Sequence, residues 1–204
     1  MSNDFWFSMA IAVVVGGFWL YKKGKNAVLT IRKIHRSFKG VCLNPKSKLS
    51  DEQCKKLAVG AMYASQQGAY QNSIETGISD LLPKILGEWW GIESTDAAKE
   101  ELDYLCEKGY RYYFPFVYQA FLLGKPEAQD EIFQQNMTSQ EDYDKIVAQF
   151  QNLQETFDEL IRCKVVAEKE ELLHYGVAGW DAGRICFLAR ACCEMGYITE
   201  AEAW

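Results

Sequence analysis

The stretch GWDAGRICFLARACCEMGYITEAEAW, residues 179–204, carries the densest pattern in the chain. Residues 182–195 contain no proline, and almost every residue there is compatible with a helix. Gaps of three and four place four apolar side chains on one helical face: Ile185, Leu188, Cys192 and Met195. A helix that is apolar on most sides is normally buried, and Gly196 supplies the residue that ends it. The stretch therefore predicts a buried helix.

Five residues of this stretch form a candidate site: Trp180, Asp181, Arg184, Arg190 and Glu194. Asp181 and Arg184 are three apart, and Arg190 and Glu194 are four apart, so each pair can meet on one helix. In the functional interpretation, both arginines bind the anionic group of a phosphorylated small molecule. In the structural interpretation, which we favour, the pairs tie the helix to its neighbours, because buried charges usually survive by being paired. Trp180 is then a core anchor.

The end of the chain carries a helix start. Thr199 and Glu202 form a T-x-x-E capping box, with Ile198 before the cap. Only two residues follow Glu202. Either the domain continues beyond this chain, or the end docks as a single turn.

The blocks GWDAGR, FLAR and GYITEAEAW resemble the C-terminal signature of a bacterial family, domain of unknown function 1266 (the YbeU/YbeR-like proteins). LSDEQCKKLAVGAMYASQQGAY (49–70) resembles the opening helix of that family, and LGEWWGI (86–92) its central Trp-Gly block. The resemblance covers about residues 49–204. It implies a fold but no established activity, and in such family members the domain usually continues past the final Trp.

The charge is distributed unevenly along the 204 residues. Residues 22–48 hold nine Lys or Arg and no acid, whereas residues 49–204 hold 27 acids and 13 bases, a net charge of −14. Such an asymmetry indicates two environments, one beside an anionic surface and one in solvent.

The seven cysteines show no spacing typical of a metal site, and the chain has only two histidines. We therefore predict no metal, no cofactor and free thiols in a reducing compartment. Cys192 and Cys193 are expected to be core residues rather than a redox pair. The sequence contains no G-x-x-x-x-G-K-[ST], G-x-G-x-x-G, H-E-x-x-H or G-x-S-x-G motif. Whether the chain is an enzyme stays open, with the balance toward a non-enzyme.

Residues 5–21, FWFSMAIAVVVGGFWLY, are uncharged and mostly apolar, with aromatic residues at both ends. As a helix they would span roughly 26 Å, close to the ~30 Å hydrocarbon core of a bilayer. We expect a transmembrane anchor (1–21) rather than a cleaved signal peptide, because the positive charges follow the apolar run. The positive-inside rule then places the N-terminus outside a bacterial inner membrane and the domain in the cytoplasm. A buried helix of a soluble protein is the alternative.

Residues 22–48 form a basic juxtamembrane segment and linker, in which 25–41 have an amphipathic pattern. Such a segment suits an anionic membrane surface, and lipid phosphates are a simpler partner than nucleic acid beside an anchor. A turn at Asn44-Pro45 ends it. The residues expected at the membrane surface are Lys22, Lys23, Lys25, Arg32, Lys33 and Arg36.

Several helices are expected in the domain at 49–204. A capping box of Ser50 and Gln53 opens a helix through about Gln67, and a second helical segment at about 74–88 is kinked or broken at Pro83. A helix capped by Thr95 or Asp96 runs to about Lys108, and the longest runs from a Thr138 cap to about Glu171. The side chains expected to face inward on the first and third helices are Cys54, Leu57, Ala58, Ala61, Met62, Ala98, Leu102, Leu105 and Cys106.

Aromatic residues suggest a second functional surface. Trp89 and Trp90 are expected in a turn. Residues 110–118, YRYYFPFVY, hold six aromatics. If this segment is a strand, Pro115 restricts it to the edge of a sheet. The possible pocket aromatics are Trp89, Trp90, Tyr110 and Tyr112. Burial in the core is the more common fate of such residues.

The strand signal is weak throughout, so the sequence predicts an all-α fold: one N-terminal transmembrane helix and a compact multi-helix cytoplasmic domain. We expect the domain to act as a protein-interaction or regulatory module. One version of this function is an immunity-type module that masks a basic toxin. The alternative is a ligand-binding or enzymatic domain that uses Asp181, Arg184 and Arg190. The sequence leaves the oligomeric state open.

Overall fold

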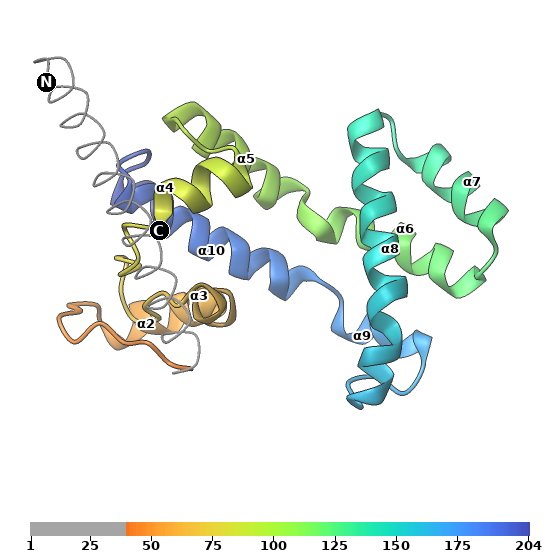
Figure 1. Cartoon of the computed structure of the whole chain (residues 1–204), viewed down its shortest axis with the longest axis horizontal. Coiled ribbons are helices and arrows are strands. Elements are labelled where there is room, and N and C mark those ends of the chain that lie inside the picture. The colour runs from red at the N-terminus through yellow and green to blue at the C-terminus, as the bar shows by residue number, and fades with distance from the viewer. Residues whose placement is uncertain (1–39) are drawn as a thin grey trace, which may run out of the picture. The chain divides into compact units, whose positions relative to one another are not determined.

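The computed structural model describes residues 40–204, which divide into two compact units, one ending at Gly91 and one running from Ile92 to Trp204. Every regular element in this part of the chain is helical (Figure 1), which confirms the predicted all-α class. The predicted anchor and the basic residues at 22–36 lie outside the described residues. None of the helices between residues 40 and 204 is long and apolar enough to cross a membrane.

The first unit begins with two short helices, α2 (Asp51–Leu57) and α3 (Ala61–Gln67), joined by a 3-10 turn, η1 (Ala58–Gly60). The predicted capping box of Ser50 and Gln53 forms, and Gly68 ends α3 in the left-handed conformation. The prediction that Ala58 and Met62 face inward is wrong, because both are exposed. The tighter 3-10 winding rotates the rest of the segment, so that Tyr63 and Ala64 become the buried residues of α3.

The second predicted helix, 74–88, is much shorter in the structure. It consists of α4 (Leu82–Lys84) and the π-helical η2 (Ile85–Trp89). Pro83 therefore lies in the first turn of a helix instead of kinking its middle, since that is where a missing N–H costs no intrahelical bond. Trp89 ends η2 and Trp90 caps it, so the two do not form the predicted turn. Gly91 follows with φ of +66°.

The second unit contains the longer helices. They are α5 (Thr95–Glu107), α6 (Gly109–Leu123), α7 (Pro126–Asn136), α8 (Gln140–Arg162), η3 (Lys169–Glu171), α9 (Leu172–Tyr175), α10 (Ala178–Glu194) and α11 (Glu200–Ala203). Helices α6, α7 and α8 pack together as a group, while α10 packs along α5 and reaches α6 (Figure 1).

The aromatic segment 110–118 lies within α6 and is not a strand. Its buried side chains follow the helical period, at Tyr113, Val117, Ala120 and Phe121, whereas a strand would bury alternate residues. Pro115 lies inside this helix on its exposed side.

The core of this unit is aromatic. Phe121 on α6 meets Phe150 and Phe157 on α8 edge to face, with ring centroids 6.3 and 5.0 Å apart, and Phe133 on α7 meets Phe150 at 5.6 Å. Such pairs add about 0.5–1.5 kcal/mol each beyond the burial of their area. Apolar side chains of α8 at gaps of three and four therefore face this core: Tyr143, Ile146, Phe150, Leu153, Phe157 and Leu160.

Two helix boundaries differ from the predictions. Helix α8 is capped by Ser139, one residue after Thr138, and it ends at Arg162 instead of about Glu171. Lys164 has φ of +55°, a conformation that cannot continue a helix. Helix α5 is capped by Ser94 rather than Thr95 or Asp96, and Cys106 on it is exposed instead of inward.

The closing helix α10 is buried on several sides, as its sequence predicts, and it starts four residues earlier than expected. Gly196 follows it with φ of +76°. The predicted capping box of Thr199 and Glu202 forms and opens the single turn α11. Glu202 also pairs with Lys99 on α5 at 2.9 Å, so the last turn docks on α5.

Candidate functional site

The first polar cluster is centred on Asp181, in the first turn of α10, whose side chain has no exposed surface. Its carboxylate accepts hydrogen bonds from the backbone N–H groups of Tyr110, at 3.1 Å, and Arg111, at 2.8 Å. These two N–H groups are in the first turn of α6. The N-cap residue of that helix, Lys108, supplies no side-chain cap. Asp181 therefore caps α6 from a distance of 70 residues, and its negative charge suits the positive end of that helix.

Gly109 allows the carboxylate to come this close. It has φ of +55°, and a Cβ atom placed there would lie 2.6 Å from Asp181 Oδ2. Only glycine combines this conformation with the space that the carboxylate needs.

Arg184 completes the cluster. Its guanidinium donates to Asp181, which forms the predicted pair, and it lies over the ring of Tyr110 at 4.1 Å from the centroid. Arg111 Nη1 lies 3.6 Å from the same carboxylate. The Arg184 residue is only 7% exposed. These contacts favour the structural interpretation of the pair, since the guanidinium and carboxylate are already engaged with each other and with α6.

Arg190 and Glu194 lie further along α10, and Arg190 is 1% exposed. Burial lowers the pKa of Arg190, while the charges of Cys186 and Glu194 act in the opposite direction. Trp180, the predicted core anchor, is half-buried.

The four predicted pocket aromatics are divided between the two units. Trp89 and Trp90 belong to the first unit, and Trp89 is 53% exposed. Tyr112 is 38% exposed, with its ring against Tyr113. Tyr110 lines a cavity of the second unit.

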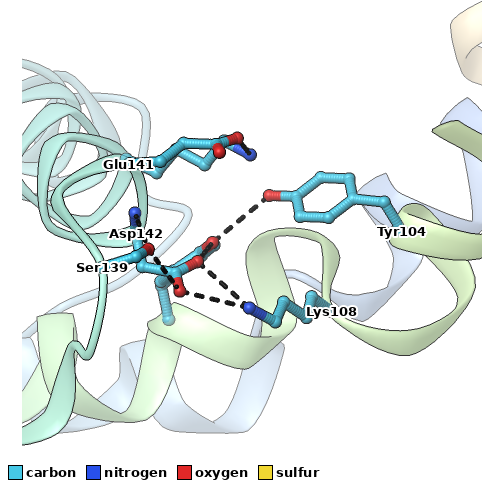
Figure 2. Close-up of polar contacts among 7 residues, drawn as sticks. Tyr104, Lys108, Ser139, Glu141 and Asp142 are labelled. Atoms are coloured by element: carbon cyan, nitrogen blue, oxygen red, sulfur yellow. Dashed lines mark hydrogen bonds and ion pairs between the residues drawn. The ribbon is translucent and has the colours of Figure 1, made fainter. Parts of the chain in front are cut away.

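A second polar cluster was not predicted from the sequence (Figure 2). Asp142, in the first turn of α8, accepts from Lys108 Nζ at 3.2 Å, from the Tyr113 hydroxyl at 2.6 Å and from Ser139 Oγ at 3.0 Å. Ser139 in turn accepts from the Asp142 backbone N–H and caps α8. The cluster thus joins the end of α5, the body of α6 and the start of α8.

These contacts set the ionisation of the cluster. The Tyr113 hydrogen bond lowers the pKa of Asp142, and Lys108 and Ser139 act the same way against burial. Burial, followed by the hydrogen bond to Asp142, raises the pKa of Tyr113 far above its usual range. Asp142 is therefore a weak base and Tyr113 a weak acid near neutral pH, which suits a structural role better than proton transfer.

Charged and aromatic groups lie beside the second cluster. Lys145 pairs with Glu141 at 2.7 Å and lies 4.0 Å from the centroid of the Tyr104 ring, and the Tyr104 and Tyr113 hydroxyls are 3.4 Å apart. Burial raises the pKa of the neighbouring Glu101.

The signal for this cluster is weak in the sequence. Ser139 and Asp142 have the spacing of an N-cap and its third helical residue, but Thr138 and Glu141 have the same spacing one residue earlier. Lys108 lies 34 residues before Asp142, so the two meet only because α5 packs against α6 and α6 packs against α8.

The second unit has cavities between its helices. One, of about 280 Å³, lies between α6 and α8 and is lined by Tyr110, Phe114, Val117, Gln149, Asn152, Leu153, Thr156 and Val177. Another, of about 440 Å³, lies where α11 meets α5 and α10, and includes Leu102, Cys106, Ile185, Ala189 and Trp204.

The seven cysteines all lie in the described residues, and no disulfide joins them there. Cys192 is fully buried, and its burial raises the pKa of the thiol to about 11, as expected for a core residue. Cys106 and Cys163 are exposed, so they do not serve as core residues.

Comparison with known proteins gives one match. Residues 85–204, more than half of the chain, match the model of a family described as "Protein of unknown function (DUF1266)". No curated protein and no solved structure matches the chain. The matched range includes the Trp-Gly block and the closing motif, whereas the block at 49–70 lies before it. The chain therefore belongs to the DUF1266 family of proteins of unknown function.

Proposed function

We propose that this chain is a membrane-tethered module whose helical domain binds a basic protein partner and catalyses no reaction. The observation that carries the proposal is the acidic outer side of α8. Its apolar stripe faces the core, while the exposed residues include Glu141, Asp144, Glu155, Asp158 and Glu159.

The charge of the whole second unit supports the same partner. Residues 92–204 hold 22 acids and 10 bases, a net charge of −12. A field of this sign speeds the encounter with a basic protein and disfavours an acidic one. An immunity-type module that masks a basic toxin is one specific form of this function.

The tether is proposed from residues 1–48. The apolar run 5–21 would span the bilayer, and the basic residues that follow would hold the chain on the cytoplasmic face of a bacterial inner membrane, with its N-terminus outside. The bacterial origin and the relation to YbeU/YbeR-like proteins belong to this proposal too.

The alternative function, binding of a phosphorylated molecule through Asp181, Arg184 and Arg190, has less support. An incoming phosphate would have to displace Asp181 from Arg184 and reach an Arg190 side chain that is 1% exposed. Arg184→Gln distinguishes the two. A structural pair predicts a loss of about 3–5 kcal/mol in the free energy of unfolding. A ligand site predicts a stably folded variant that no longer gains thermal stability from phosphorylated compounds.

The proposed function is tested with the full chain in lipid nanodiscs, used to capture proteins from a membrane-associated cell extract. Two exposed acids on α8, Glu155 and Asp158, are both changed to lysine. The control carries Glu93→Lys and Glu107→Lys, which alter the net charge equally at exposed positions elsewhere.

We expect a basic protein to be enriched by the wild type and the control, to dissociate at high salt, and to be lost with the α8 variant. Equal capture by both variants, or capture that is insensitive to salt, would exclude the acidic side of α8 as the binding surface.

A further inference from the structure

The first unit exposes apolar side chains close to the residue at which its described part begins. Four of them are 57–65% exposed: Val41, Leu43, Val59 and Met62. Single exposed apolar side chains are ordinary on a protein surface, whereas a group of them in one place marks an interaction site. The contacts around Gly40 bring these four together.

Val41 and Leu43 extend from the same side of the segment that enters the unit. Exposure alternates along this segment, because Cys42 and Asn44 are buried. Side chains of an extended backbone alternate between two sides, so Val41 and Leu43 point away from the unit together. The segment is held by the backbone N–H of Gln71, which donates to the carbonyl oxygen of Cys42 at 2.9 Å.

Helix α3 brings Met62 and Val59 to the same segment. The Ser65 hydroxyl donates to the carbonyl oxygen of Gly40 at 2.9 Å, so the segment starts against this side of α3. Met62 precedes Ser65 by three residues and Val59 precedes Met62 by three, a spacing that keeps side chains on one side of a helix. The four apolar side chains therefore share the part of the surface where the chain enters the unit.

Lysines border these apolar side chains. Lys55 is four residues before Val59, which places it on the same side of the helical segment. Residues 40–62 hold two acids, Asp51 and Glu52, and four bases, a net charge of +2, whereas residues 92–204 have a net charge of −12. This part of the chain therefore attracts an anionic surface. The four bases are exposed: Lys46, Lys48, Lys55 and Lys56.

The combination of exposed apolar side chains and lysines indicates which anionic surface this is. Such a combination is typical of segments that lie in the interface of an anionic bilayer, where apolar groups enter the headgroup region and amines reach the lipid phosphates. A nucleic acid would attract the lysines but would leave the four apolar side chains in water.

The proposed tether would keep this surface close to a bilayer. Residues 22–39 separate the apolar run 5–21 from Gly40, and eighteen residues span at most ~65 Å at full extension. They hold seven Lys or Arg and no acid, so they favour the same leaflet. A contact that is weak by itself becomes intramolecular in this arrangement, and its effective concentration rises.

We propose that the entry patch, which consists of Val41, Leu43, Val59, Met62 and the four lysines, lies on the anionic leaflet of the bilayer. The inference rests on the proposed tether and adds a second membrane contact to it. The apolar side chains enter the headgroup region, and the lysines pair with lipid phosphates. The first unit is thereby held on the membrane surface.

The test uses the full chain in nanodiscs that contain phosphatidylglycerol, with p-benzoylphenylalanine in place of the exposed Val59. Under ultraviolet light this side chain inserts into nearby C–H bonds, and mass spectrometry distinguishes lipid adducts from protein adducts. A second chain carries the same amino acid in place of Gln154, which is exposed on the acidic helix α8. We expect a lipid adduct at position 59 and little or none at position 154.

Two further substitutions test the apolar side chains. Leu43→Gln together with Met62→Gln should lower the lipid adduct at position 59 by about tenfold or more, since burial of one such side chain is worth about that factor. The matched control, Leu123→Gln with Leu173→Gln, changes exposed leucines of the second unit and should leave the adduct unchanged. Circular dichroism shows that each variant is folded.

The lysines are tested with the charge of the lipid. Lys55→Gln together with Lys56→Gln should lower the adduct by about fivefold or more in nanodiscs with phosphatidylglycerol. In nanodiscs of phosphatidylcholine alone, which carry no net charge, the same variant should match the wild type. If the variant matches the wild type in both lipids, the lysines do not recognise the anionic leaflet and the proposal is wrong.

The proposal is also overturned if position 59 labels a second copy of the chain, another protein or residues 22–39 instead of lipid, because that partner then covers the patch. Lipid labelling that Leu43→Gln with Met62→Gln does not reduce overturns it too. Size-exclusion chromatography at high salt tests the tether separately. A chain that leaves the nanodiscs contradicts the tether and the docking that rests on it, whereas a chain that stays but forms no lipid adduct contradicts the docking alone.

Discussion

Asp181 holds two helices together through a single carboxylate. It is fully buried and accepts from two backbone N–H groups of α6 and from Arg184. Asp181→Asn turns one acceptor oxygen into a donor that faces other donors and leaves Arg184 without its counter-charge. We expect a loss of about 3–5 kcal/mol in the free energy of unfolding, measured by urea denaturation. Asp158→Asn, at an exposed position, should change it by less than about 0.5 kcal/mol. A loss below about 1 kcal/mol for Asp181→Asn would contradict the capping role.

Tyr113 controls the charge of Asp142. Its hydrogen bond is the largest cause of the lowered pKa of Asp142, relative to an ordinary value of 3.8. Because the folded pKa lies below the unfolded one, this carboxylate stabilises the fold above about pH 4 and loses that effect as the pH falls through the folded pKa. Tyr113→Phe should raise the pKa of Asp142 and remove about 1.5–3 kcal/mol of stability at neutral pH.

The measurement for Tyr113→Phe is an NMR titration of the Asp142 side-chain carbonyl carbon, together with urea unfolding at pH 7. Tyr112→Phe is the control, because Tyr112 is 38% exposed and its ring lies next to Tyr113. If both variants leave the pKa of Asp142 where it is in the wild type, Tyr113 does not set it.

At the scale of elements, the last turn α11 depends on Glu202. Lys99, followed by the groups of Thr199, lowers the pKa of Glu202 to about 2, against an ordinary value of 4.5. The contribution of Glu202 to docking is therefore present above pH 4.5 and is lost as the pH falls toward 2. Lys99→Met should move this loss to higher pH, because it removes the largest cause.

The undocking of α11 is followed through the NMR signal of the Trp204 indole as the pH is lowered. Lys125→Met, at an exposed position before α7, is the control and should titrate as the wild type does. An identical midpoint for Lys99→Met would mean that the capping box alone holds α11.

The elements that sequence reasoning predicted correctly are those whose signals are local. The apolar period of α10 and the capping boxes at Ser50 and Thr199 each depend on residues within a few positions of one another. The pair of Asp181 and Arg184 belongs to this group too, since one helical turn separates its members.

The predictions failed in two situations. In one, a local change in the backbone rotated or ended a helix, and in the other, the contacting residues are far apart in sequence. The 3-10 turn η1 turned Met62 outward, and the positive φ of Lys164 ended α8 early. No local pattern pairs Asp142 with Lys108 or directs Asp181 toward α6. The first contact needs α8 packed on α6, and the second needs α10 packed on α6. The sequence therefore identified the Asp181–Arg184 pair. The role of Asp181 as a cap of α6, and the whole cluster around Asp142, became visible only in the packed structure.

At the scale of the whole molecule, the apolar run and the charge asymmetry predict that membrane attachment weakens stepwise as the chain is shortened from its N-terminus. Full-length chain should resist extraction from membranes by both salt and alkaline carbonate, since a spanning helix is held effectively irreversibly. A chain starting at residue 22 keeps nine bases ahead of residue 49 but lacks the apolar run. It should sediment with anionic vesicles at low salt and dissociate at high salt, because each base near the surface adds about 1 kcal/mol that salt screens. A chain starting at residue 44 keeps only Lys46 and Lys48 of those bases and should not sediment.

If the chain from residue 22 resists extraction by carbonate, the membrane anchor lies elsewhere than in residues 5–21. If high salt releases the full chain from membranes, residues 5–21 do not span the bilayer.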